Sequence, residues 1–252
     1  MTKFIVTTIN PDNGQLTRFH YDNATSELTR ETGEPLVQAV EVTERAHVPT
    51  VSRQTPLGKT SPRTLKISLG LSCNYECEYC SQRFVPRIVE TNPGDVQAFI
   101  DGLDAWVTSP PEKVEFWGGE PLVYIKTMRP LAEAIRAKFP NAELSVITNG
   151  SLLNDDINDW LDRMGFSVGI SHDGPGQPVR GPDPLQDPEQ RAAIMALYAR
   201  LAPQRRISFN AMVNRENASR AAIQRFFIEL TGDPAVPIGE GSFVDAYDEG
   251  GI

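Results

Sequence analysis

Three cysteines, Cys73, Cys77 and Cys80, lie within eight residues and form a CxxxCxxC motif. Thiolates are soft ligands that select zinc or iron–sulfur clusters. A structural zinc ion needs four protein ligands, but the sequence has no fourth cysteine, and its three histidines are not at the usual short spacing. An iron–sulfur cubane on three thiolates leaves one iron open, as a catalytic site requires. Three unrelated core cysteines are a third interpretation, which their crowding among polar residues disfavours.

Three further motifs follow later stretches of strand-like sequence. They are Gly-Gly-Glu-Pro at 118–121, Thr-Asn-Gly at 148–150 and Ser-His-Asp-Gly-Pro at 171–175. Carboxyl ends of parallel strands meet at one edge of a sheet or barrel, where α/β proteins assemble their sites. Adjacent glycines let a backbone approach a ligand closely, although alone they indicate only a turn. The order of the motifs therefore predicts one site, built at one edge.

The CxxxCxxC motif, with an aromatic residue before its last cysteine, resembles the radical S-adenosylmethionine (radical SAM) superfamily, as does the Gly-Gly-Glu-Pro sequence. The matches extend from about 65 to 214 in one order. The 171–175 motif is similar to the peptide- and sulfatase-maturing branch, whose members carry a cysteine-rich SPASM/twitch extension. This sequence has no cysteine after Cys80. The resemblance implies an α/β fold, a partial (β/α)6 barrel, with a 4Fe-4S cluster and S-adenosylmethionine as cofactors.

The resemblance also implies site residues. Cys73, Cys77 and Cys80 would bind the cluster, and the residues that would contact S-adenosylmethionine are Tyr79, Gly118, Gly119, Glu120, Ser171 and Arg180. The two glycines would approach the methionyl amino group, and Glu120 would steady this region or accept from the amine. Ser171 would hydrogen-bond the cosubstrate. Arg180 would bind the methionyl carboxylate, with a solvated surface arginine as the alternative. No catalytic residue beyond the cluster ligands can be assigned.

The expected reaction is reductive cleavage of S-adenosylmethionine followed by hydrogen abstraction from a substrate. The motifs favour a peptide or protein side chain as that substrate, with Asn210, Asn214 and Glu240 facing it and a flavodoxin- or ferredoxin-type electron donor. A small-metabolite substrate stays open. The alternative function is a truncated or degenerate non-catalytic barrel, stabilised by a cluster or by zinc, that binds a partner. A partner subunit would then complete the barrel.

Composition excludes several classes of protein. Hydrophobic residues make up 40% and charged residues 23% of the 252 residues, as in folded globular proteins. The net charge of −9 and the lack of a basic stretch argue against nucleic acid as a partner. No run reaches the roughly 20 apolar residues of a membrane helix, and the N-terminus does not resemble a signal peptide. Three cysteines cannot build a disulfide framework, so we expect a cytoplasmic protein.

Strand and helix patterns alternate from residue 64 onward. Alternating apolar residues predict a first strand at 65–71, and further strands are expected at 114–117, 144–147, 167–170, 206–213 and within 236–247. Helices are expected at 94–107, 129–139, 155–164, around 194–201 and at 219–230, with Phe99 facing inward and 174–188 as a loop. Trp117, Phe226 and Phe227 are expected in the core, and His172 in local packing. This alternation indicates right-handed crossovers and a parallel sheet.

Two domains are expected. Residues 1–63 would form a β-meander with strands near 4–8, 16–21 and 27–29, followed by a proline-containing linker that packs on the main domain. Residues 64–252 would form the radical SAM core, with its last helix missing. For the N-terminal region we favour a capping role over substrate recognition.

Overall fold

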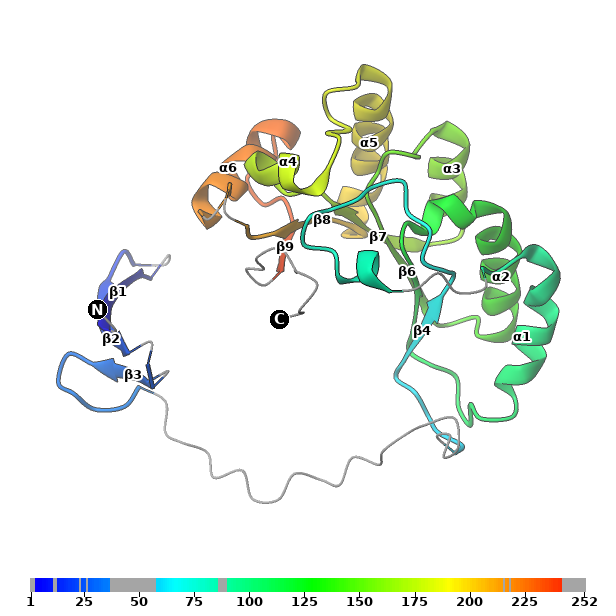
Figure 1. The fold of residues 1–252 in the computed structure, drawn as a ribbon, viewed down its shortest axis with the longest axis horizontal. Coiled ribbons are helices and arrows are strands. Elements are labelled where there is room, and N and C mark those ends of the chain that lie inside the picture. Colours follow the sequence, from blue (N-terminus) through cyan, green and yellow to red (C-terminus); the bar gives the residue numbers. More distant parts are fainter. Residues whose placement is uncertain are drawn as a thin grey trace. The chain divides into compact units, whose positions relative to one another are not determined.

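The computed structural model describes residues 3–10, 13–22, 24–25, 27–36, 58–85, 90–214, 216–217 and 219–241. The chain divides into two compact units, Met1–Pro56 and Leu57–Ile252 (Figure 1). The expected linker falls largely on residues 37–57, which lie outside the described part. Each unit is considered by itself below.

The N-terminal unit is a three-stranded antiparallel meander of β1 (Lys3–Ile9), β2 (Leu16–Asp22) and β3 (Glu27–Arg30). The pairing of Phe4 with Tyr21 and of Val6 with Phe19 fixes its register. Gly14 supplies the left-handed backbone of the first turn, with φ of +69°. The small β-rich region expected at the N-terminus is therefore present.

The main unit is built on six parallel strands in the order in which they occur along the chain. They are β4 (Thr64–Ser68), β5 (Lys113–Trp117), β6 (Glu143–Thr148), β7 (Phe166–Ser171), β8 (Ile207–Met212) and β9 (Ile238–Gly241). Sequential order without a reversal point is the order of a barrel wall, not of a doubly wound sheet. The alternation of strand and helix patterns in the sequence does not distinguish these two architectures.

Helices connect successive strands and lie together on one side of the sheet (Figure 1). The longer ones are α1 (Val96–Leu103), α2 (Ile125–Lys138), α3 (Asp155–Arg163), α5 (Pro188–Leu201) and α6 (Arg220–Thr231). Short turns of helix are η1 (Ser81–Phe84), η2 (Pro93–Asp95), η3 (Pro121–Tyr124), η4 (Gly174–Gly176), α4 (Gln177–Arg180) and η5 (Ala202–Gln204). This is an α/β fold that forms a partial (β/α)6 barrel.

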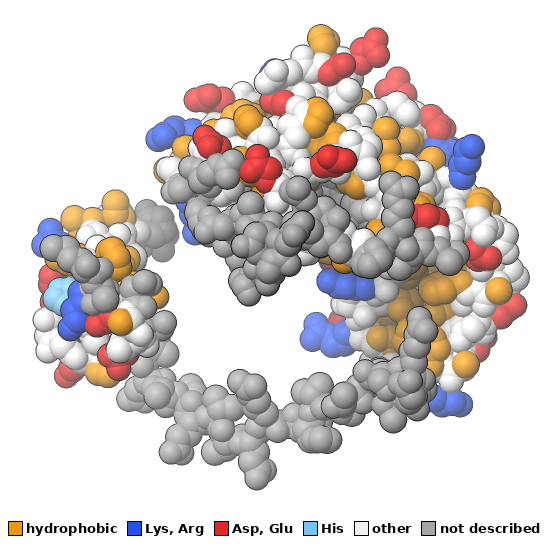
Figure 2. Space-filling view, viewed as in Figure 1, with side chains coloured by type: hydrophobic (Ala, Val, Ile, Leu, Met, Phe, Trp, Pro, Cys, Tyr) orange, Lys and Arg blue, Asp and Glu red, His pale blue; other side chains and the backbone are white. Residues whose placement is uncertain are grey.

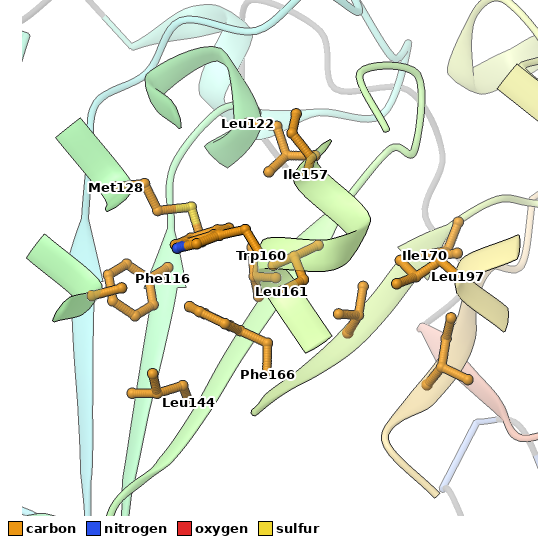
Figure 3. Close-up of a cluster of buried hydrophobic side chains, with 14 of the residues drawn as sticks. Phe116, Leu122, Met128, Leu144, Ile157, Trp160, Leu161, Phe166, Ile170 and Leu197 are labelled. Atoms are coloured by element: carbon orange, nitrogen blue, oxygen red, sulfur yellow. The ribbon is translucent and has the colours of Figure 1, made fainter. Parts of the chain in front are cut away.

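The core lies between the strands and these helices. Alternate strand residues such as Val114, Phe116 and Leu144 are almost fully buried on the helix side. The rings of Phe116 and Phe166 lie 5.5 Å apart, and Trp160 of α3 lies 5.2 Å from Phe166 (Figure 3). The residues between them in each strand point to the opposite, concave side, which is where the site must be sought.

Two expected helices have different limits. α1 ends at Leu103, short of the expected 107, and Phe99 is 37% exposed although it was expected to face inward. α2 begins four residues before the expected start, because burial of Thr127 and Met128 stabilises its first turn. In α2, tertiary packing thus outweighs the local sequence signal.

Two other expectations were wrong. The 174–188 stretch, expected as a loop, contains η4 and α4, and a proline near the start of each turn favours the helical backbone. Trp117, expected in the core, is 41% exposed, because its place in β5 puts it on the concave side with Lys113 and Glu115.

On the face of the main unit seen in Figure 2, acidic and basic side chains are interspersed and form no broad basic surface. Among the described residues, no helix is long and apolar enough to cross a membrane.

Candidate functional site

The three cysteines lie in the loop that follows β4. The amide of Glu78 donates to the carbonyl of Val179 at 3.0 Å, which ties this loop to α4. The amide of Tyr75 donates to Sγ of Cys73 at 3.4 Å. Cys73 is exposed and the other two cysteines are half-buried. The loop therefore presents its thiols at the surface of a fixed backbone.

The donor set fits an iron–sulfur cluster better than zinc. Within the described ranges, no three His, Cys, Asp or Glu side chains converge on the position of one metal ion. Sulfur ligands of a tetrahedral zinc ion would lie about 3.8 Å apart, given Zn–S bonds of about 2.3 Å. A polynuclear cluster spaces its thiolates further apart, because each thiolate binds a different iron. The amide directed at Cys73 also favours a thiolate at that position.

Gly118 and Gly119 lie against the backbone of the segment that leads from the end of β4 to the cysteines. The amide of Gly119 donates to the carbonyl of Gly70 at 3.0 Å, and Glu120 donates likewise to Ser72 at 3.0 Å. A Cβ on Gly118, whose φ is +157°, would lie 2.7 Å from the Gly70 carbonyl oxygen. A Cβ on Gly119 would lie 2.3 Å from the carbonyl oxygen of Ser72. Both positions must therefore be glycine because the backbone at 70–72 lies so close to them, whether or not a ligand also approaches them.

Glu120 joins the ends of β5 and β6. Its carboxylate accepts from the Leu122 amide at 3.0 Å, the Thr148 hydroxyl at 2.7 Å and the Asn149 amide at 2.7 Å. Only 2% of its surface is exposed, and this burial raises the pKa of its carboxyl group against the lowering effect of the three donors. Glu120 is therefore fixed by its own chain and positions two of the loops at this edge.

The Thr-Asn-Gly turn is connected to the cysteine loop. Nδ2 of Asn149 donates to Oδ1 of Asn74 at 2.8 Å, and Nδ2 of Asn74 donates to Ser151 at 2.8 Å. Asn74 directly follows Cys73 in the motif. These two side-chain hydrogen bonds link the Thr-Asn-Gly turn and the serine after it to the first motif.

Asp173 connects the fourth motif to the cysteine loop. Its fully buried carboxylate accepts from Arg180 Nη2 at 2.8 Å, from the Tyr79 hydroxyl at 2.5 Å and from the Met212 amide at 2.9 Å. The guanidinium carbon of Arg180 also lies 5.5 Å from the centre of the Tyr79 ring. Asp173 thus holds Tyr79, which precedes Cys80, together with α4 and β8.

One cavity of about 740 Å³ lies at this edge of the sheet. All nine residues that the sequence predicted line it, namely Cys73, Cys77, Tyr79, Cys80, Gly118, Gly119, Glu120, Ser171 and Arg180. Residues far apart in the chain therefore meet, because each follows a strand of one parallel sheet. A volume of this size suits a small-molecule cofactor.

The model of the Radical SAM superfamily matches residues 67–222, which contain all of these residues. The chain belongs to this superfamily. The match covers the sheet from within β4 to the start of α6, so it includes the strands that carry the four motifs.

Curated relatives of this radical SAM chain differ in what they do. An S-adenosylmethionine-dependent nucleotide dehydratase of a Thermoplasmatales archaeon is 32% identical over 104 residues, 40% of this chain and 33% of that protein. A serine-type anaerobic sulfatase-maturating enzyme of Bacteroides thetaiotaomicron is 28% identical over 116 residues, 42% of this chain and 28% of that protein. The chain thus spans about a third of the length of the curated relatives that it matches.

Solved radical SAM structures share the fold. Histidine-tagged anSMEcpe with bound AdoMet has a TM-score of 0.59 at 21% identity, covering 75% of this chain and 53% of that one. Streptococcus suis SuiB bound to precursor peptide SuiA has a TM-score of 0.54 at 15% identity, covering 72% and 39%. At these identities the likeness establishes the fold.

Burial raises the pKa of two thiols in the radical SAM cavity. It raises the pKa of the Cys77 thiol to about 11, although the charge of Arg180 acts in the opposite direction. The pKa of Cys73 is raised for the same reason. Metal binding would have to displace these protons, since the thiolate is the ligand.

Ser171 and Arg180 reach the cavity in different ways. Ser171 is the last residue of β7 and is half-buried. Arg180 is paired with Asp173 through Nε and Nη2, and in the described part of the chain its Nη1 has no protein partner. The alternative of a solvated surface arginine is wrong, because only 10% of the side chain is exposed.

The three positions expected to face a substrate have separate places. Asn210, in β8, lines a second cavity on the concave side. Asn214 is 2% exposed and donates to the Gly176 carbonyl at 3.3 Å, so it holds a loop and was wrongly expected to face substrate. Glu240 is opposite Ala211 in register, and its side chain lies outside the described residues.

The sequence did not assign a role to Asp173 or to Asn149. Both stand in motifs that were visible in the sequence. The partners of Asp173 include Arg180, 7 positions away, and Tyr79, 94 positions away. Sequence separation gives no indication of such contacts. An acidic residue in a glycine- and proline-containing motif was the signal that the sequence offered.

Proposed function

We propose that this protein is a radical SAM enzyme that modifies a side chain of a peptide or protein. The observation that carries the proposal is that all three cysteines line one cavity together with residues of the other three motifs. A structural or partner-binding module would not need these groups to converge on an open cavity.

Cys73, Cys77 and Cys80 are proposed to hold a 4Fe-4S cluster. When bound, such a cluster supplies the electron that cleaves S-adenosylmethionine reductively. The protein's own part is to bind and orient. Ser171 offers a hydroxyl to the cosubstrate, and Nη1 of Arg180 offers a charged donor for its carboxylate.

The remaining residues act on the geometry of the cosubstrate site. Tyr79 is proposed to contact the adenine with its ring or backbone, since its hydroxyl is engaged by Asp173. The backbone at Gly118 and Gly119 would approach the amino group. Of the two roles expected for Glu120, steadying this region and accepting from the amine, we propose the first. Its carboxylate already accepts from three donors of its own chain.

The relatives include a nucleotide dehydratase, but others support a peptide as substrate. One is named as a sulfatase-maturating enzyme, and two structural neighbours contain peptides, SuiB with precursor peptide SuiA and anSMEcpe with Cp18Cys peptide. The electron donor is proposed to be a flavodoxin or ferredoxin in the cytoplasm. We place the radical SAM core at 64–252 and a separate β-rich region at 1–63.

Anaerobic reconstitution with iron and sulfide tests the cluster. Wild-type protein should acquire about four irons per chain and absorb at about 400 nm, whereas Cys77→Ala should not. Dithionite and S-adenosylmethionine should then yield 5′-deoxyadenosine above the Cys77→Ala background. A full cluster without this product would favour the non-catalytic, partner-binding module, and stoichiometric zinc without iron would refute the cluster itself.

A further inference from the structure

The two ends of the segment that carries the three cysteines meet at Ser72 and Glu90. Oγ of Ser72 donates to Oε1 of Glu90 at 3.1 Å, although the two residues are 18 positions apart. The hydroxyl of Thr91, the next residue, donates to the carbonyl of Leu69 at 2.5 Å. All three cysteines lie in the chain between these two points of contact. The cysteine loop is therefore closed where it begins and ends.

Tyr124, the last residue of η3, lies at this closure. Its hydroxyl accepts from the amide of Ser72 at 2.6 Å and donates to Oε2 of Glu90. Its side chain is only 8% exposed. One buried hydroxyl thus binds both ends of the loop, and we call the contact among Ser72, Glu90 and Tyr124 the neck of the cysteine loop.

Ser72, which directly precedes Cys73, is held through all of its polar groups. Its amide donates to Tyr124 and its hydroxyl to Glu90. Its carbonyl accepts from the amide of Glu120 at 3.0 Å. Two of these three partners belong to the segment that carries the Gly-Gly-Glu-Pro motif and η3. The backbone beside the first cysteine is therefore fixed by the loop that follows the next strand of the sheet.

The backbone at Gly70 leaves room for the neck. Its φ is +143°, and a Cβ at this position would overlap both Oε2 of Glu90 and the hydroxyl oxygen of Tyr124. A side chain at residue 70 would therefore push the tyrosine and the carboxylate away from Ser72. The neck thus depends on a glycine two residues before Ser72, which is what a contact built into the fold requires.

We infer that Tyr124 is a positioning residue for the cysteine loop, because its hydroxyl holds the neck closed. Joining the ends of a loop removes many of its conformations, so less order remains to be imposed when the thiols bind their ligand. The inference rests on the proposed function in one respect, since it takes the three cysteines to be the cluster ligands. The competing explanation is a tyrosine that contributes only to the overall stability of the fold.

Hydrogen exchange on the metal-free, full-length protein tests the neck without a cluster. Tyr124→Phe removes only the hydroxyl, so the Ser72 amide loses its acceptor and exchange in residues 70–80 should become about five- to tenfold faster. Tyr198→Phe is the matched control. The Tyr198 side chain is 6% exposed, and its hydroxyl donates to Asp233 at 2.9 Å. This variant should lose comparable overall stability and leave exchange in residues 70–80 as in wild type.

Release of iron from reconstituted protein to a ferrous chelator is the second measurement. Release should be about five- to tenfold faster in Tyr124→Phe than in wild type, as expected from the loss of one or two hydrogen bonds, and unchanged in Tyr198→Phe. Glu90→Gln presents an NH2 group to one of the two donors at the neck, so it should accelerate both processes as well. It answers the question if Tyr124→Phe does not fold.

Wild-type exchange and wild-type iron release in Tyr124→Phe or in Glu90→Gln would overturn the inference. Equal acceleration in Tyr198→Phe would also overturn it, because loss of overall stability would then explain the effect. Iron uptake by wild-type protein is measured separately. Its failure would refute the proposed cluster, and the exchange measurement would still decide whether Tyr124 holds the neck closed.

Discussion

The carboxylate of Asp173 accepts hydrogen bonds from Nη2 of Arg180 at 2.8 Å and from its Nε at 3.2 Å, in the wall of the cysteine cavity. The carboxylate is fully buried, and the arginine side chain is 10% exposed. A pair in such surroundings is costly to break, because the remaining charge stays buried without compensation. The same carboxylate binds Tyr79 of the cysteine loop, so the pair fixes the loop as well as α4.

Asp173→Asn should therefore destabilise the protein by about 3 kcal/mol, as expected for removal of one charge from a buried pair. The substitution keeps the side-chain shape and removes only the charge and one acceptor. Urea denaturation measures the loss. Asp104→Asn is the matched control, because Asp104 pairs with Lys138 at 2.6 Å but is 73% exposed; it should cost less than about 1 kcal/mol. Equal losses in the two variants would contradict the structural role of Asp173.

Glu120→Gln should cost about 1–2 kcal/mol in unfolding free energy. In glutamine an NH2 group, which cannot accept a hydrogen bond, replaces one of the carboxylate oxygens. At least one of the donors Thr148 and Asn149 therefore loses its partner. The substitution also removes the cost of burying a charged carboxylate, the same cost that raises the pKa of Glu120, and this keeps the loss of stability modest. Glu133→Gln, on the exposed side of α2, should change stability by less than about 0.5 kcal/mol. Thermal unfolding of both variants beside wild type provides the comparison.

The sequence predicted the positions of the motifs well, because a parallel sheet gathers all its carboxyl ends at one edge. Cys80 and Arg180 are far apart in the chain and still line one cavity. What the sequence could not supply was the set of bonds among these residues. Asp173 and Tyr79 meet only because β4 and β7 belong to one sheet, and nothing in either motif indicates the other as its partner.

The errors in the fold have a common physical origin. Trp117 was assigned to the core by its residue type, although alternation with the buried Phe116 places it on the concave side. The start of α2 was placed four residues too late, because the sequence pattern does not show that Thr127 and Met128 are buried in the folded protein. Local preferences were thus overridden where tertiary packing was stronger.

Asp183 should make the stability of the protein dependent on pH in the acid range. Nδ1 of His172 accepts from the Gly174 amide at 3.0 Å, so Nε2 carries the proton that it donates to Asp183 at 3.0 Å. This bond lowers the pKa of Asp183 in the folded state. Its stabilisation is therefore present above the ordinary value of about 3.9 and is lost as pH falls through the lower folded value.

Asp183→Asn should accordingly be less stable than wild type by about 1 kcal/mol at pH 7, and this difference should shrink at about pH 3. Urea denaturation at both pH values checks the sign. Asp101→Asn, on the exposed side of α1, serves as the control and should have a small effect at both. A difference that grows toward low pH would show that the bond to His172 is not the origin of the effect.

Two glycines of the main unit should respond to alanine in opposite directions. A Cβ on Gly119 would lie 2.3 Å from the Ser72 carbonyl oxygen and 2.6 Å from that of Leu71, which are backbone atoms that cannot move aside. Gly119→Ala should thus destabilise the protein by at least about 2 kcal/mol and displace the segment that leads from β4 to the cysteines. A Cβ on Gly102, in α1, would meet no atom within 4 Å. Gly102→Ala should therefore stabilise by about 0.5–1 kcal/mol through the better helix propensity of alanine. Thermal unfolding gives both signs, and cluster reconstitution should fail or weaken in Gly119→Ala alone. If Gly119→Ala bound iron as wild type does, the close approach of the segments that follow β4 and β5 would not be needed to form the cysteine loop.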